Sequence, residues 1–278
     1  MRRFIAALAF TTALTLTPSS ALANILYGNS AGSNAIHLID PLTGVEIARF
    51  TPNSGNGRAV VTVGNTIYYT VVGDPHIYEL NATTGAPTGS ILTQNASMST
   101  LAWDGSHFWT ADYSGTNHAF EIDPLTGSNI KTITLANASG NMDGLEYFNG
   151  KLIGNRCDAC GTYDIYDLDG NVLTSAFITA PSSATGIAFD GTNFLVSNIF
   201  NSSIGVYSGT TGQLLNTVNL TSQFGSFLIE DLSVDYSQRV DTGGGGVPEP
   251  STWAMMLVGF GAIGMTFRKR NRKSFKLA

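Results

Sequence analysis

Basic residues are scarce in the middle of this 278-residue chain. Between residues 24 and 247 lie six of its 14 lysines and arginines but 19 of its 20 acidic residues, which gives this segment a formal net charge of −13. A surface of that sign repels nucleic acids and other anionic polymers unless a cation bridges the two. We therefore expect no nucleic-acid partner for this segment.

The chain has only two cysteines, Cys157 and Cys160, in the stretch NRCDACGTY. A zinc site would need a second pair of ligands, and covalently bound haem would need a histidine where Gly161 stands. In an oxidising compartment a local disulfide is the expected state of two cysteines at this spacing. A redox-active pair is the less favoured alternative, because the helix start of a thioredoxin-like site is missing.

Metal-binding motifs are also missing. The sequence contains no Asp-x-Asp-x-Asp-Gly calcium loop, and its four histidines form no metal-spaced pair. We expect structural or solvent-facing roles for the histidines, which are His37, His76, His107 and His118. Aromatic residues recur in apolar stretches, where packing between sheets explains them better than a sugar-binding platform.

The N-terminus is built differently from the middle. MRRF is basic, IAALAFTTALTLT is apolar, and PSSALA ends in small residues at its last and third-last positions. This layout is typical of a secretory signal peptide, and the apolar run is too short to span a membrane. The sequence therefore predicts a signal peptide over residues 1–23, removed by signal peptidase to leave Asn24 as the first residue.

The C-terminus carries a second apolar segment, the uncharged residues 251–267. As a helix these 17 positions would be about 25 Å long, enough to cross a locally thinned bilayer. Trp253 stands where an interfacial aromatic residue would stand. Basic residues follow at once and are expected to stay in the cytoplasm, with the body of the protein on the other side. They are Arg268, Lys269, Arg270, Arg272, Lys273 and Lys276.

The residues before and after that segment carry a specific resemblance. Pro248-Glu249-Pro250, then Trp253-Ala254, an apolar span and a basic tail resemble the PEP-CTERM sorting signal of Gram-negative bacteria. The resemblance implies an exported protein that is anchored transiently in the inner membrane and cut at Pro-Glu-Pro by an exosortase. It also implies release or transfer to the cell surface, often alongside exopolysaccharide. The glycine-rich residues 241–247 are expected to be a flexible linker that lets a protease reach the cut.

The segment between the two termini repeats itself. HLIDPLTGVEIARF, YELNATTGAPTGSI, FEIDPLTGSNIKTI and VYSGTTGQLLNTV each read as strand, turn and strand, and a weaker copy starts at Ile165. Asp-Pro followed by Thr-Gly is hairpin chemistry, because proline presets φ and glycine accepts the positive φ of the turn. The turn glycines Gly44, Gly85, Gly127 and Gly212 are spaced by about one or two periods of 42 residues. A second strand pair precedes each hairpin, as in TLAWDGSHFWTADY and GIAFDGTNFLVSNI.

Four strands in about 42 residues is the content of a β-propeller blade. Complete blades are predicted to begin near residues 59, 100, 144 and 186. The start of the mature chain supplies three strands of a fifth blade, and EDLSVDY from Glu230 supplies the missing first strand. We therefore predict an all-β, five-bladed propeller over residues 24–240, closed by this 3+1 arrangement. Six blades is the second choice and a β-sandwich the third.

The repeats are similar to those of extracellular bacterial propellers with NHL, YVTN or quinoprotein-like units, a resemblance that implies the fold but no catalytic motif. Ligands of propellers usually meet the ring near the axis, beside the starts of the innermost strands. Three carboxylates and an arginine are expected there, and we call Arg58, Asp143, Glu230 and Asp231 the funnel residues. They predict either a site for a polar ligand or a cation such as Ca²⁺, or turn-capping and solvated acids without a ligand.

We expect no resident cofactor. The favoured function is a non-enzymatic binding module at the cell surface or outside the cell, whose partner is a polysaccharide or a surface protein. The alternative is an extracellular metal-dependent hydrolase or lactonase-like enzyme with its site in the funnel.

Overall fold

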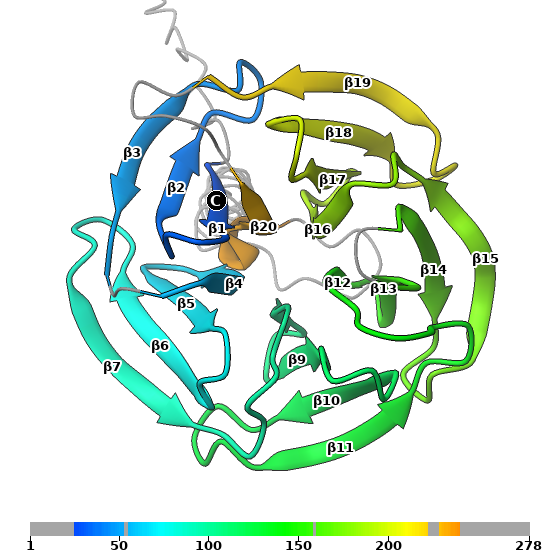
Figure 1. The fold of residues 1–278 in the computed structure, drawn as a ribbon, viewed down its shortest axis with the longest axis horizontal. Helices are drawn as coiled ribbons and strands as arrows, with labels where there is room; N and C mark the ends of the chain where they lie inside the picture. Colours follow the sequence, from blue (N-terminus) through cyan, green and yellow to red (C-terminus); the bar gives the residue numbers. More distant parts are fainter. Residues whose placement is uncertain (1–24, 53–54, 158–159, 222–227, 240–278) are drawn as a thin grey trace, which may run out of the picture.

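The computed structural model describes residues 25–52, 55–157, 160–221 and 228–239. Within them, 20 strands form five four-stranded antiparallel sheets arranged as the blades of a ring (Figure 1). This confirms the predicted five-bladed propeller. The predicted signal peptide, the linker, the Pro-Glu-Pro motif, the apolar span and the basic tail lie outside the described residues. No helix within the described residues is long and apolar enough to cross a membrane.

Each blade runs from an innermost strand at the axis to an outermost strand at the rim. Blade 1 contains β4 (Gly57–Val63), β5 (Thr66–Val71), β6 (His76–Asn81) and β7 (Pro87–Leu92). Blade 2 contains β8 (Ala102–Trp103), β9 (Phe108–Ala111), β10 (His118–Ile122) and β11 (Asn129–Thr134). Blade 3 contains β12 (Leu145–Phe148), β13 (Lys151–Asn155), β14 (Thr162–Tyr166) and β15 (Val172–Thr179). Blade 4 contains β16 (Ala184–Phe189), β17 (Asn193–Asn198), β18 (Ser203–Ser208) and β19 (Leu214–Asn219).

Blade 5 combines the two ends of the described chain. Its strand order is β20 (Ile229–Val234), β1 (Leu26–Ser30), β2 (Ile36–Ile39) and β3 (Glu46–Phe50). β20 pairs antiparallel with β1, with Leu26 opposite Val234 and Gly28 opposite Leu232. The last strand of the described chain is therefore the innermost strand of the blade that the first three strands build.

Hairpins between the two outer strands of the blades follow the sequence repeat. Gly44 has a φ of 71° and Gly127 a φ of 69°, so both occupy the left-handed region that their turns require. The amide of Gly44 donates to the carbonyl of Asp40 at 2.8 Å, and the amide of Gly127 donates to Asp123 at the same distance. The Asp-Pro-x-Thr-Gly stretches therefore close the turns predicted for them.

Burial falls from the axis to the rim. β16 and β20 are buried along their whole length, whereas most residues of β7 and β19 are exposed. The apolar core is divided into five clusters, each shared by two neighbouring blades. Between blades 3 and 4, the rings of Phe148 and Phe194 pack edge to face with centroids 4.9 Å apart. The recurring aromatic residues thus serve blade packing, as their positions in the repeat indicated.

β8 is shorter than the other innermost strands, and its ladder with β9 begins at Ala102. Just before it, the amide of Ala111 donates to Oγ1 of Thr100 at 3.2 Å, and the amide of Leu101 donates to Oδ2 of Asp231 in blade 5 at 3.3 Å. Elsewhere on the ring, Cys157 and Cys160 form the predicted disulfide in the loop between β13 and β14.

Candidate binding site at the entry face of the ring

The five innermost strands run in the same direction along the axis, so the ring has two distinct faces. We call the face at which these strands begin the entry face and the face at which they end the exit face. Each funnel residue lies in the first half of an innermost strand or just before that strand begins. The contacts of each funnel residue decide what it can do.

Arg58 and Glu230 meet across the junction between blades 5 and 1. They form an ion pair in which the side chain of Arg58 is 14% exposed and that of Glu230 is 5% exposed. The guanidinium also lies over the ring of Tyr113 in blade 2, 4.3 Å from its centroid. A planar cation against an aromatic face is a favourable contact that orients both groups. Arg58 thus links three blades near the axis on the entry face.

Asp231 is fully buried at the axis. Its Oδ2 accepts hydrogen bonds from the amides of Val60 at 3.1 Å and Leu101 at 3.3 Å, which belong to blades 1 and 2. Its Oδ1 has no hydrogen-bond partner among the described residues. Burial raises the pKa of this carboxyl well above its usual value, opposed by the backbone amides and reinforced by the charge of Glu146. The residue therefore acts mainly as an acceptor that joins three blades.

Asp143 binds within its own blade. The side-chain amide of Asn155 donates to a carboxylate oxygen of Asp143, and Oδ1 of Asn155 accepts from the amides of Asp143 and Gly144, both at 3.2 Å. This reciprocal arrangement ties the start of β12 to the end of β13. At the junction between blades 4 and 5, Oγ1 of Thr185 donates to the carbonyl of Ile229 at 3.2 Å. The polar groups around the axis are thus largely engaged in joining strands and blades.

The exit face has a polar centre that sequence reasoning missed. Glu146 is 1% exposed, and its carboxylate accepts hydrogen bonds from the amide of Tyr147 at 2.7 Å and the amide of Phe189 at 3.2 Å. It also accepts from the hydroxyl of Tyr236 and pairs with Arg239 at 2.9 Å. Burial raises the pKa of Glu146, while the charge of Arg239 opposes the rise. The sequence does carry a signal for Glu146, because the equivalent positions of the other blades hold small or apolar residues. These are Val61, Ala102, Ala188 and Ser233.

Tyr236 and Arg239 belong to a short segment that covers the axis on the exit face. A 3₁₀ helix, η1 (Tyr236–Gln238), directly follows β20 and is capped by Asp235, whose side chain accepts from the amide of Ser237. Oδ1 of Asp235 also accepts from the amide of Gly64 in blade 1 at 2.8 Å. We call residues 235–239 the exit cap. The described chain therefore ends in a segment bonded to blades 1 and 3.

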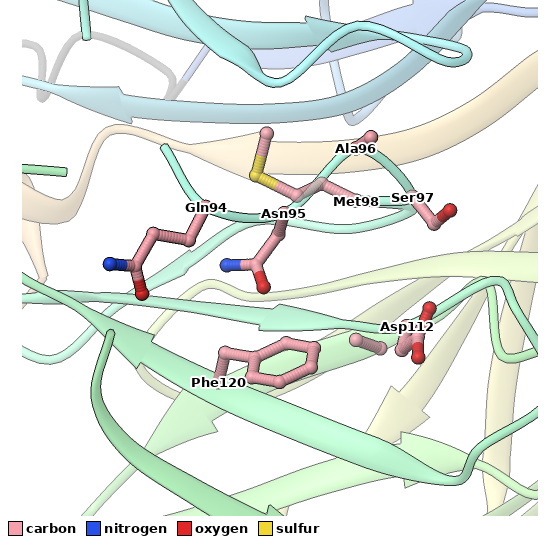
Figure 2. Close-up of a pocket in the computed structure, with 8 residues that line it drawn as sticks. Gln94, Asn95, Ala96, Ser97, Met98, Asp112 and Phe120 are labelled. Carbon is pink, nitrogen blue, oxygen red and sulfur yellow. The ribbon is translucent and has the colours of Figure 1, made fainter. Parts of the chain in front are cut away.

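Two of the pockets on the entry face lie on either side of the loop that joins β7 to β8. One, of about 150 Å³, lies between that loop, Arg58 and Tyr113. The other, of about 190 Å³, is shown in Figure 2. The amide groups of Gln94 and Asn95 project from the loop toward Phe120 (Figure 2). The lining residues of this second pocket are Gln94, Asn95, Ala96, Ser97, Met98, Ala111, Asp112 and Phe120.

The lining of this pocket combines neutral polar groups with apolar side chains and one carboxylate, that of Asp112. Asn95 and Asn129 exchange side-chain hydrogen bonds at 2.7 and 3.2 Å, which fixes the Asn95 amide. Asp112 is held by the amide and hydroxyl of Ser114 at 2.8 and 2.6 Å. Amide and hydroxyl groups can both donate and accept hydrogen bonds, and Phe120 adds an aromatic surface. The arrangement can therefore bind an uncharged polar group beside an apolar face.

Comparison with known proteins identifies one sequence motif. Residues 246–272 match the PEP-CTERM protein-sorting motif. This motif implies export and membrane-associated sorting in Gram-negative bacteria, and such signals are processed by exosortase, a membrane protease. No curated protein is significantly similar to the chain in sequence.

Two solved structures share the fold at low sequence identity. The glutaminyl cyclase of Myxococcus xanthus aligns with a TM-score of 0.50 and 15% identity, over 59% of this chain and 70% of its own. A chain of the nidogen/laminin complex aligns with a TM-score of 0.54 and 12% identity, over 77% of this chain and 99% of its own. Likeness at this level concerns the propeller fold and carries no activity or partner to this chain.

Proposed function

Because residues 246–272 carry the PEP-CTERM sorting motif, we propose that this chain is an exported propeller that is held briefly at the inner membrane. An exosortase-type protease cuts at Pro248-Glu249-Pro250, and the body then works at the cell surface or outside the cell. There it acts as a non-enzymatic module that binds a neutral polysaccharide of the matrix. The strand pairing of β20 with β1 holds the ring closed after the tail is removed.

The position of the exit cap indicates which face of the ring lies toward the membrane. Arg239 is fixed to blade 3 through Glu146, and eight residues separate it from Pro248. A chain of that length reaches at most about 30 Å. While the tail is anchored, this tether favours an arrangement in which the exit face lies near the membrane. The entry face and its pockets then point away from it, toward the space in which matrix polymers lie.

The pocket in Figure 2 is the observation that carries the binding proposal. Its amide and hydroxyl groups suit the hydroxyls of a sugar, and Phe120 suits the apolar face of a sugar ring. At about 190 Å³ it is smaller than the pockets of about 300–1,000 Å³ that enclose drug-sized ligands. It therefore suits one unit of a polymer. The acidic body disfavours anionic polymers, so the ligand is uncharged.

The contacts of the funnel residues favour a binding module over a hydrolase. Glu230 is already paired with Arg58, and Oδ2 of Asp231 with two backbone amides. A metal ion at Glu230 would compete with Arg58, whose ion pair joins two blades, and Asp231 is fully buried. The pockets beside the entry face impose no such cost on ligand binding.

The test is binding of the intact chain to neutral exopolysaccharide purified from the host, measured by co-sedimentation over a range of polymer concentrations. Gln94→Ala is expected to weaken binding about three- to tenfold, the effect of losing one hydrogen bond of about 0.5–1.5 kcal/mol. Gln213→Ala is the matched control, because Gln213 is also exposed but lies in the turn between β18 and β19. Equal binding by wild type and Gln94→Ala would refute the pocket. No binding by wild type would refute the function.

A further inference from the structure

Three side chains with metal-ligating atoms meet on the exit side of blade 2. Asp104 follows β8, His107 precedes β9, and Glu121 lies in β10, opposite Trp109 of β9. Nδ1 of His107 is 2.9 Å from Oε1 of Glu121 and 3.8 Å from Oδ2 of Asp104. One ligand atom from each residue lies within 4.8 Å of the others, the one such grouping found across the described ranges.

The turn between β8 and β9 holds the Asp104 carboxylate in place. Its Oδ1 accepts from the amides of Ser106 at 2.8 Å and His107 at 2.7 Å. Its Oδ2 accepts from the indole Nε1 of Trp109 at 3.0 Å, and Trp109 is 1% exposed. An ionised carboxylate has about four lone-pair sites, so these three bonds leave capacity for a metal ion. The carboxylate is thus oriented without an ion.

The spacing of the three groups suits a transition-metal ion. Two ligand atoms about 2.1 Å from one ion are about 3.0–3.4 Å apart at octahedral or tetrahedral angles. The separations of 2.9 and 3.8 Å fall on either side of that range, so small side-chain rotations suffice. One imidazole and two carboxylates form a mixed donor set that suits Zn²⁺ and its neighbours in the first transition series.

Solvent can complete the coordination. The side chain of His107 is 36% exposed, and those of Asp104 and Glu121 are 14% and 16% exposed. An ion held by these residues would keep open positions for water. The strong excess of acidic over basic residues in the body also raises the local concentration of cations.

We propose that Asp104, His107 and Glu121 form a mononuclear site for a divalent transition metal of the zinc class, with water as the remaining ligand. The site is separate from the funnel residues and from the pocket in Figure 2, and it stands whether or not that pocket binds a polysaccharide. A bound ion would connect the β8–β9 turn to β10 and so stabilise blade 2.

The test uses the intact chain without a polyhistidine tag, purified in detergent and stripped with a chelator. Calorimetric titration with Zn²⁺ is expected to give one ion per chain, with a Kd below about 100 μM. At about 100 times the Kd, Zn²⁺ should raise the thermal midpoint by about 5–10 °C. Co²⁺ should bind in its place and quench the fluorescence of Trp109, which is hydrogen-bonded to Asp104.

Variants separate a metal site from a simple ion-paired histidine. His107→Ala and Glu121→Gln are each expected to weaken Zn²⁺ binding at least tenfold. His76→Ala is the matched control, because His76 is also 36% exposed and pairs with Asp74 at 2.7 Å but belongs to no three-ligand grouping. The proposal is overturned if wild type binds no stoichiometric Zn²⁺, if His107→Ala binds it equally well, or if His76→Ala weakens binding as much.

Discussion

The buried pair of Glu146 and Arg239 should make the stability of the ring depend on the exit cap. The side chains are 2% and 5% exposed, so replacing Arg239 by alanine leaves a carboxylate buried without its cation. Loss of one partner from a buried ion pair costs about 3–5 kcal/mol, which corresponds to a fall of roughly 10 °C in the thermal midpoint of a domain of this size.

The pH dependence of that loss has a definite sign. Burial raises the pKa of Glu146 in the folded state, with Arg239 opposing the rise. When the pKa of a group is higher in the folded state than in the unfolded state, the group contributes its full stability at pH values below the unfolded-state pKa. That contribution is lost as the pH rises through the folded-state pKa. Removing Arg239 raises the folded pKa further. The deficit of Arg239→Ala relative to wild type should therefore grow between pH 5 and pH 8.

Urea denaturation of the intact chain at pH 5, 6.5 and 8, followed by tryptophan fluorescence, measures this effect. Adding Glu146→Gln to Arg239→Ala should remove most of the pH dependence, because the amide carries no charge. Lys131→Ala is the control, since Lys131 and Asp169 form an exposed ion pair that contributes about 0–1 kcal/mol. A deficit in Arg239→Ala that matches this control at every pH would refute the assigned role of the pair.

Two further predictions concern the axis. A Cβ on Gly186 would meet Oδ1 of Asp231 at 2.8 Å and the carbonyl of Glu230 at 2.7 Å, so Gly186→Ala should cost about 1–3 kcal/mol in urea denaturation. Gly89→Ala, which faces only the flexible end of Glu79, should cost far less, and equal losses would contradict close packing at the axis. Because burial raises the pKa of Asp231, Asp231→Asn should gain stability relative to wild type as pH rises from 5 to 8. An unchanged difference over that range, measured by thermal unfolding, would show that Asp231 is already ionised in the folded state and would contradict the raised pKa.

The sequence predicted the fold because each blade repeats the same local chemistry. The spacing of Gly44, Gly85, Gly127 and Gly212 gave the period, and each of these glycines adopts the positive φ that its turn requires. The strand expected from Glu230 is β20, which pairs with β1. The turns and strands follow from patterns within about 42 residues. The pairing of β20 with β1 follows from counting those strands around a closed ring, so both can be predicted from the chain alone.

The candidate sites depend on contacts between residues far apart in the chain. Position in the repeat placed Arg58 and Glu230 at the entry face, but their ion pair joins residues 172 positions apart. Glu121 approaches His107 only because β10 lies beside β9. The pocket in Figure 2 depends on how the loop before β8 lies over blade 2. No local pattern encodes these distances, which arise once the ring has formed.

The central claim is that this propeller leaves the cytoplasm and is then freed from a temporary C-terminal anchor. Intact-mass spectrometry of the protein recovered from the surface and extracellular fractions of its host tests that claim most directly. The account predicts a species that begins at Asn24 and ends within residues 248–250. Recovery of a surface species that still carries residues 251–278 would contradict it.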